Sequence, residues 1–305
     1  MLIYQPPGFE QRAIATELGV MAYYTQSNAT WGTLPDTAPV YIFLHSLGGG
    51  SSAFEWSKCY PAWAGRSHII AMDLVGWGQS AHPPHIYSAE DYLTLIEQGI
   101  RTVLQERADS ATSLPPLVLF ASSLTAGLVV RLAIRQPELF QTLVLVCPSG
   151  YGDFGMGYEF GLSAQIARLP GVDQALYQLG AANATAVQSV LQQFLFAQPA
   201  RVTADMVAAY LASAQQPNSH YSALASLRGD LCFDLALYWP RLRVPTILLW
   251  GEQARFSTLA TGRRLAALNS DSLMAFYSIP NAGVLPHLEA PEWAIAALEP
   301  HLAPA

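Results

Sequence analysis

The fold is decided by the stretch Leu117-Val118-Leu119-Phe120-Ala121-Ser122-Ser123-Leu124-Thr125-Ala126-Gly127. It begins as an apolar, β-prone run and passes, through a small-any-Ser-any-small pattern, into a helical sequence. This pattern predicts a sharp turn that holds Ser123 in a strained conformation with its hydroxyl exposed. Ala121 and Thr125 stand where glycine would leave more room, which weakens the motif taken alone. A plain strand-to-helix turn is the alternative.

The rest of the chain repeats the same alternation of short apolar runs and longer helical patterns. It is typical of a mostly parallel sheet with helices on both faces. Ser88, with Asp91 three residues later, predicts the start of a helix that ends near Arg107, and a second helix is predicted over residues 127–136. Eight strands are predicted, over residues 13–17, 20–24, 40–44, 69–73, 117–120, 142–146, 246–250 and 273–278.

The alternation stops over residues 150–237, where Pro170, Pro199 and Pro217 separate four amphipathic helical pieces. We expect this segment to be a helical cap, and residues 1–149 and 238–305 to form the core. Such a cap covers the carboxyl edge of the sheet, where open α/β folds bind ligands. Its aromatic residues, Tyr151 and Phe154 among them, either line an apolar pocket or pack the cap.

Composition limits the function classes. Only 12% of the 305 residues are charged, against about 25% in an average protein, and 51% are hydrophobic. An exposed apolar surface would suit a protein partner, a membrane face or a lipid-like ligand; a large core under a polar exterior is the alternative. A net charge of −7 with one lysine, Lys58, argues against nucleic acid.

Neither a leader sequence nor a long apolar span is apparent, so we expect a cytoplasmic protein, with peripheral attachment to a membrane left open. Three cysteines at wide spacing give no metal-ligand pattern. The sequence therefore predicts no metal and no cofactor.

Three further runs that contain small residues lie at the ends of predicted strands. In His45-Ser46-Leu47-Gly48-Gly49-Gly50, the backbone N–H of Leu47 is placed to donate to an oxyanion, and Leu124, directly after Ser123, is placed to supply a second N–H. The runs Trp250-Gly251-Glu252 and Ile279-Pro280-Asn281-Ala282-Gly283 complete the pattern. Together these runs resemble the α/β-hydrolase superfamily, in its capped esterase, lipase and C–C hydrolase branch, over essentially the whole chain. The resemblance implies an α/β-hydrolase fold with an eight-stranded sheet and a helical cap. Residues 228–235 and 262–265 also resemble a group of uncharacterised cyanobacterial proteins of this fold.

The resemblance implies a catalytic serine at Ser123, an acid three residues after Gly251 and a base directly after Gly283. Those last two positions hold Ala254 and Val284, which cannot accept a proton. Loss of the histidine alone lowers kcat by about 2 × 10⁶ in a well-studied serine protease, and against a median kcat of about 10 s⁻¹ this leaves roughly one turnover per day or fewer.

Replacement groups have to be weighed. His287, three residues beyond Val284, and His45, beside the oxyanion turn, are candidates for a relocated base, although structural roles are the ordinary explanation for both. Asp153 and Glu159 follow the sixth strand, the second place where this superfamily carries its acid. Arg255, next to Ala254, is placed to pair with a ligand carboxylate or with a surface acid.

The sequence therefore predicts a pseudo-hydrolase that binds an apolar small molecule, an ester-like ligand or a protein partner. A β-branched residue at position 284 would extend the pocket wall, an arrangement similar to that of the plant gibberellin receptors. An active esterase-like hydrolase using Ser123 with His287 or His45 is one alternative, and an assembly or scaffold factor at a membrane surface is another. The sequence leaves the ligand and the oligomeric state open. The predicted pocket residues are His45, Ser46, Tyr151, Phe154, Arg255 and His287.

Overall fold

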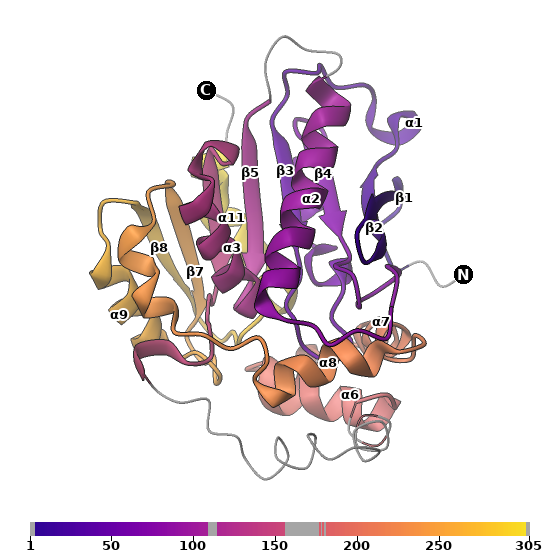
Figure 1. The fold of residues 1–305 in the computed structure, drawn as a ribbon, viewed down its shortest axis with the longest axis vertical. Helices are drawn as coiled ribbons and strands as arrows, with labels where there is room; N and C mark the ends of the chain where they lie inside the picture. Colours follow the sequence, from indigo (N-terminus) through magenta and orange to yellow (C-terminus); the bar gives the residue numbers. More distant parts are fainter. Residues whose placement is uncertain (1–3, 109–114, 156–176, 178, 180, 303–305) are drawn as a thin grey trace.

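The structure is a computed structural model that describes residues 4–108, 115–155, 177, 179 and 181–302. Eight strands form one sheet in the order β1-β2-β4-β3-β5-β6-β7-β8 (Figure 1). Strands β3 to β8 are parallel to one another, and β2 is antiparallel to both β1 and β4. The strands are β1 Phe9–Thr16, β2 Gly19–Gln26, β3 Val40–Leu44, β4 His68–Met72, β5 Leu117–Ser122, β6 Thr142–Val146, β7 Thr246–Gly251 and β8 Leu273–Ile279.

The predicted eight-stranded, mostly parallel sheet is confirmed. The largest difference is at β1, which begins at Phe9 rather than Ala13, because β1 and β2 form a hairpin that pairs all the way from Thr16↔Gly19 to Phe9↔Gln26. The sequence does not indicate the full length of β1, because most of its residues are exposed and an edge strand covered on one side needs few apolar residues.

Helices cover both faces of the sheet. Helices α2 (Ala89–Ala108) and α3 (Ser123–Arg135) lie in front of it in Figure 1, and α11 (Pro291–Leu302) lies behind. The other core helices are α1 Asn28–Trp31, η1 Ala53–Trp56, η2 Tyr60–Trp63, η3 Pro137–Leu139, α9 Leu259–Leu268 and α10 Pro286–Glu289.

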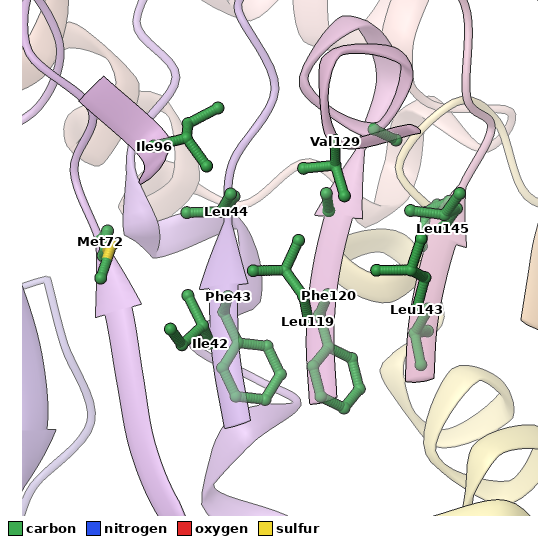
Figure 2. Close-up of a cluster of buried hydrophobic side chains, with 14 of the residues drawn as sticks. Ile42, Phe43, Leu44, Met72, Ile96, Leu119, Phe120, Val129, Leu143 and Leu145 are labelled. Carbon is green, nitrogen blue, oxygen red and sulfur yellow. The ribbon is translucent and has the colours of Figure 1, made fainter. Parts of the chain in front are cut away.

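Side chains of the central strands alternate between the two faces, as a pleated sheet requires. Figure 2 shows Leu44 near Ile96 of α2, whereas the rings of Phe43 and Phe120 lie together on adjacent strands, with ring centroids 4.3 Å apart. All four side chains are fully buried. This core fixes the carboxyl ends of β3 and β5, from which the loops of the site extend.

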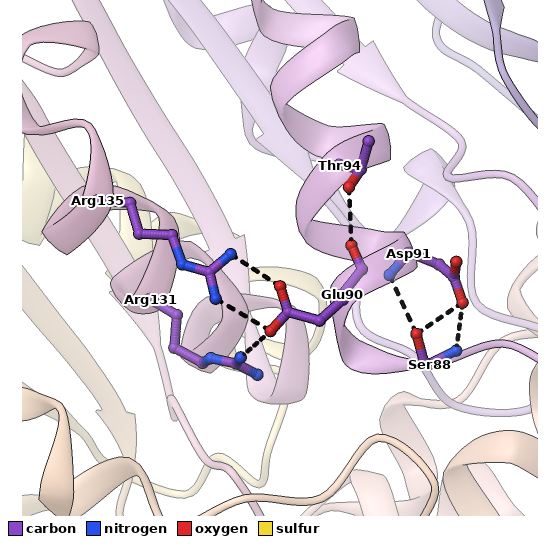
Figure 3. Close-up of polar contacts among 6 residues, drawn as sticks. All are labelled: Ser88, Glu90, Asp91, Thr94, Arg131 and Arg135. Atoms are coloured by element: carbon purple, nitrogen blue, oxygen red, sulfur yellow. Dashed lines mark hydrogen bonds and ion pairs between the residues drawn. The ribbon is translucent and has the colours of Figure 1, made fainter.

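The start of α2 is held by the predicted capping interaction. The Asp91 carboxylate accepts hydrogen bonds from the Ser88 N–H and hydroxyl, both at 2.7 Å, and the Asp91 N–H donates to the Ser88 hydroxyl (Figure 3). In the same first turn, Glu90 forms ion pairs with Arg131 and Arg135 of α3. These contacts join α2 to the helix that begins at Ser123.

The segment between β6 and β7 carries the remaining helices. Helices α6, α7 and α8 lie together below the sheet in Figure 1, at the carboxyl ends of the parallel strands. A parallel bridge between Tyr151 and Phe233 brings the two ends of the segment side by side. The division at residues 150 and 237 stays a prediction. The described helices between β6 and β7 are η4 Asp153–Gly155, α6 Ala184–Val190, η5 Leu191–Leu195, η6 Pro199–Arg201, α7 Ala204–Ala214, α8 Ser219–Arg228, η7 Leu235–Leu237 and η8 Trp239–Arg241.

Candidate functional site

Ser123 lies at the sharp junction between β5 and α3. Ser122 ends the strand, and Ser123 begins the helix with a φ of 53°, in the left-handed region that side chains other than glycine rarely adopt. Such a conformation costs about 1–3 kcal/mol and persists only where its surroundings impose it. The helix therefore begins four residues earlier than predicted, and the turn has the strained form that the pattern predicts. The nucleophilic role of Ser123 stays a prediction.

Ser123 opens onto a cavity of about 530 Å³ between the core and the cap. This volume is in the range that holds a small organic molecule. The core supplies the oxyanion turn and the loops after β7 and β8, whereas η5 and α8 supply the facing wall. The lining residues are Ser46, Leu47, Gly48, Gly49, Ser123, Tyr151, Val190, Leu195, Ala223, Ser226, Leu227, Arg255, Phe256, Val284 and Leu285.

The two predicted N–H donors flank Ser123. The Leu47 N–H takes part in no hydrogen bond among the described residues, although the Leu47 carbonyl accepts one from the Ser226 hydroxyl at 2.9 Å. Ser122 occupies the N-cap position of α3 without a capping side-chain hydrogen bond, so the first turn, which includes Leu124, keeps backbone donors without a side-chain partner. Leu47 lines the cavity and Leu124 follows Ser123 in the first turn of α3, and the role of both N–H groups as oxyanion donors stays a prediction.

Glu55 is a residue that the sequence analysis missed. Its carboxylate is fully buried beneath the oxyanion turn, where it accepts hydrogen bonds from the Ser46 N–H at 2.8 Å and the Ser46 hydroxyl at 2.7 Å. It also accepts from the Ser122 hydroxyl at 3.3 Å and the Tyr210 hydroxyl at 3.0 Å. One side chain thereby joins the oxyanion turn, the residue before Ser123 and cap helix α7. A lone acid between Phe54 and Trp56 was the signal available in the sequence.

Ala254 and Val284, at the positions where the family resemblance predicts an acid and a base, are both buried. Val284 is 3% exposed, lines the cavity, and donates its N–H to the Leu195 carbonyl of η5 at 2.9 Å. Ala254 is 6% exposed and packs into the main core without lining the cavity. Gly283 permits the close approach of the loop after β8 to η5, because a Cβ at position 283 would lie 2.2 Å from the Leu195 carbonyl oxygen. Backbone and aliphatic groups therefore fill the space where a proton acceptor is expected.

The hydroxyl of Ser123 has a hydrogen-bond partner in the cavity. Its Oγ lies 3.1 Å from the phenol oxygen of Tyr151, the second residue of the cap segment. A neutral phenol donates or accepts a hydrogen bond but does not take up a proton near pH 7. This contact orients the serine hydroxyl without activating it.

His287 does not line the cavity. Its side chain is fully buried, its ring stacks on Trp56 with centroids 3.9 Å apart, and neither ring nitrogen has a hydrogen-bond partner among the described residues. Burial lowers the pKa of His287 to about 3. The ring is thus held inside the core as a neutral aromatic group, away from Ser123.

His45 does not line the cavity either, and both of its ring nitrogens are hydrogen-bonded to backbone groups. Nδ1 lies 2.5 Å from the Ser46 carbonyl oxygen, and Nε2 accepts the Leu74 N–H at 2.9 Å. The lone pair that a general base would use is therefore already engaged. The ring holds the oxyanion turn against the loop after β4.

Nearby acids bind backbone groups instead of a histidine. Asp153 accepts hydrogen bonds from Ser149 and from the Leu235 N–H, and burial raises its pKa. Glu289, which the sequence analysis missed, accepts the Gly283 N–H at 2.6 Å and the N–H groups of Ala197 and Gln198. Glu159 lies outside the described residues.

The predicted pocket is thus corrected. Ser46, Tyr151 and Arg255 line the cavity, whereas His45, Phe154 and His287 do not. Phe154 is absent because its ring is covered by the Arg264 guanidinium, 3.8 Å from the ring centroid.

A second cavity, of about 160 Å³, lies near Tyr24 and Asp73 and does not include Ser123. Across the described ranges, no group of three or more histidine, cysteine, aspartate or glutamate side chains is placed to hold a metal ion. No helix in the described part of the chain is both long and apolar enough to cross a membrane.

Comparison with known proteins agrees with this architecture. The model of a family described as the alpha/beta hydrolase family matches residues 41–297. The uncharacterised hydrolase YugF of Bacillus subtilis is 26% identical over 248 residues, which cover 79% of this chain and 82% of that protein. A haloalkane dehalogenase of Bradyrhizobium diazoefficiens is 31% identical over 109 residues, which are 36% of this chain and 32% of that enzyme.

Solved structures share the fold over almost the whole chain. Cfl2 from Burkholderia cenocepacia superposes with a TM-score of 0.74 at 17% identity, covering 98% of both chains. The haloalkane dehalogenase DbeA from Bradyrhizobium elkani gives a TM-score of 0.72 at 20% identity, covering 96% of this chain and 97% of that one. At such identities the likeness extends to the fold alone. The likeness to cyanobacterial proteins stays a prediction.

Proposed function

This chain belongs to the alpha/beta hydrolase family, and we propose that within the family it binds an apolar small molecule in the cavity beside Ser123 without hydrolysing it. The observation that carries the proposal is at position 284, where a valine side chain forms part of the cavity wall. The position that should hold a base contributes apolar surface instead.

The absence of hydrolysis follows from the path of the serine proton. Attack by a serine hydroxyl requires a group that takes up its proton as the new bond forms. The hydroxyl of Ser123 contacts Tyr151, and the rings of His45 and His287 are held by the backbone and by Trp56 respectively. None of these groups offers a free imidazole lone pair to Ser123.

Binding is supported by the features that remain. The cavity has the volume of a small-molecule site, and aliphatic residues from both the core and the cap dominate its lining. The hydroxyls of Ser46, Ser123, Tyr151 and Ser226 provide a few polar groups that would orient a ligand. Burial of an apolar molecule there gains about 25 cal/mol for each Å² of apolar surface removed from water.

The proposal is tested by native mass spectrometry of the protein purified without organic solvent, together with extraction of any bound small molecule. We expect a bound apolar species in the wild type. Ala223→Trp, which fills the cavity from α8, should reduce its occupancy at least severalfold, whereas Ser123→Ala should retain it. Urea unfolding of each variant checks that the chain still folds.

Two results would overturn the proposal. One is an empty wild-type cavity that also fails to bind apolar probes such as 1-decanol. The other is rapid ester turnover that Ser123→Ala abolishes, since that result would restore a hydrolase with an unidentified base.

A further inference from the structure

Arg255 gives the cavity a single charged side chain. Among the described residues, the lining contains no aspartate, glutamate, histidine or lysine besides this arginine. The guanidinium of Arg255 therefore sets the sign of the charge at this cavity, although the chain as a whole has a net charge of −7. Its side chain belongs to an exposed residue, so the guanidinium lies at the mouth rather than in the interior.

No carboxylate of the described residues forms an ion pair with Arg255. Glu252, the acid nearest in sequence, instead accepts a hydrogen bond from the Ser278 hydroxyl of β8 at 3.0 Å. A surface partner, which the sequence left open for this arginine, is therefore not found among the described residues. The guanidinium keeps its planar set of donors for another group.

Apolar surface lies directly beside this cation. Phe256 is 54% exposed, lines the cavity, and stacks on Phe194 of the cap with centroids 6.1 Å apart. The apolar lining of the cavity also includes Leu195, Val284 and Leu285. A cation at the rim and aliphatic groups within form a site with two chemically different ends.

We propose that the ligand is an anionic amphiphile, an apolar body in the cavity with one carboxylate held by Arg255 at the mouth. This inference rests on the proposed function and adds the ligand's charge and orientation to it. A guanidinium binds a carboxylate through two parallel hydrogen bonds, and this geometry favours an acid over an alcohol or an amine of the same chain length.

Isothermal titration calorimetry with decanoate, 1-decanol and decyltrimethylammonium tests the proposal. The wild type should bind decanoate about three- to tenfold more tightly than 1-decanol, and the ammonium compound most weakly. Arg255→Gln should remove the preference for decanoate while leaving the affinity for 1-decanol unchanged. Added salt should reduce the ratio of the decanoate affinity to the 1-decanol affinity, because the guanidinium is exposed to solvent.

Arg243→Gln is the matched control. It removes the same charge from an exposed arginine at the opposite end of β7, away from the carboxyl edge of the sheet, and should leave both affinities unchanged. If Arg255→Gln and Arg243→Gln weakened decanoate binding equally, the loss would be due to the change in net charge and not to the position of Arg255, and the proposal would be overturned.

The remaining outcomes separate this inference from the proposed function. Equal binding of decanoate and 1-decanol, or a decanoate affinity that Arg255→Gln leaves intact, would overturn the role of Arg255 while the cavity still binds apolar molecules. The second result would instead assign the carboxylate to the N–H groups near Ser123. Failure of all three probes to bind would overturn both proposals.

Discussion

The two sides of Ser123 differ in how their polar groups are arranged. On the side of the oxyanion turn, the Glu55 carboxylate collects four hydrogen bonds from Ser46, Ser122 and Tyr210. On the side where a triad would supply acid and base, Ala254 and Val284 are buried among apolar groups. One side has a dense polar network, whereas the described residues that line the cavity on the other side include no carboxylate and no imidazole.

Polar groups that hold the backbone in place can thus be present on one side of Ser123 while the other side has apolar residues at the positions expected to transfer a proton. The carboxylate of Glu55 holds elements that are distant in sequence, so its removal would affect the whole turn. The other side keeps its shape through contacts of the backbone: the Gly283 N–H donates to the Glu289 carboxylate, and the Val284 N–H donates to the Leu195 carbonyl. The cavity is therefore formed with a valine at position 284.

The largest expected effect is on the polar side. Glu55→Ala should lower the free energy of unfolding by about 3–5 kcal/mol, because it leaves buried donors of the turn, β5 and α7 without their acceptor. Urea unfolding followed by circular dichroism measures the change. Glu55→Gln, which keeps the shape and one acceptor oxygen, serves as the control and should lose less. A Glu55→Ala protein as stable as the wild type would remove the contrast between the two sides.

The second prediction concerns the pH dependence of stability at His287. The folded-state pKa, about 3, lies below the ordinary value near 6.5, so the unfolded chain binds the proton more readily. The contribution of His287 to the free energy of unfolding is therefore smallest at low pH. It is constant above about pH 6.5 and falls as the pH drops toward 3. Between about pH 7 and pH 5 the wild type should lose about 2 kcal/mol that His287→Phe does not lose. Equal pH profiles for the two proteins would mean that His287 is not held neutral in the core.

A smaller effect is expected where the polar side meets the cap. Tyr210→Phe removes one of the four hydrogen bonds to Glu55 and should cost about 1 kcal/mol in urea unfolding. Combined with Glu55→Ala, the loss should be less than the sum of the single losses, since both remove the same contact. Strict additivity would show that the two residues act separately.

The smallest effect on stability is expected on the apolar side. Val284→Thr keeps the shape of the side chain and adds a hydroxyl to the cavity wall, so stability should fall by about 1 kcal/mol or less. The affinity for 1-decanol should fall by about threefold or more, measured by calorimetry. Stronger binding in this variant would indicate a polar ligand and would contradict an apolar role for position 284.

The sequence predicted the sheet because its strands are continuous apolar runs, as β3, β5 and β7 show. It also predicted the sharp turn at Ser123, because that residue lies at a fixed offset from the end of a strand. The roles assigned to Ser123 and Val284 stay predictions. It did not predict Glu55 or Glu289, whose partners are distant in the chain: the Glu55 and Tyr210 contact spans 155 residues. Nor did it predict the orientation of His287, because a stacking partner such as Trp56 is set by packing and leaves no local pattern.

The central claim is our proposal that no group among the described residues near Ser123 accepts its proton, and the most direct test is the rate of ester hydrolysis with a matched comparator. Turnover of p-nitrophenyl butyrate and labelling by a fluorophosphonate probe would be measured for the wild type, Ser123→Ala and the double variant A254D/V284H. We predict about one wild-type turnover per day or fewer, slow labelling of Ser123, and a faster rate only in the double variant. Wild-type turnover near 1 s⁻¹, abolished by Ser123→Ala, would contradict the account.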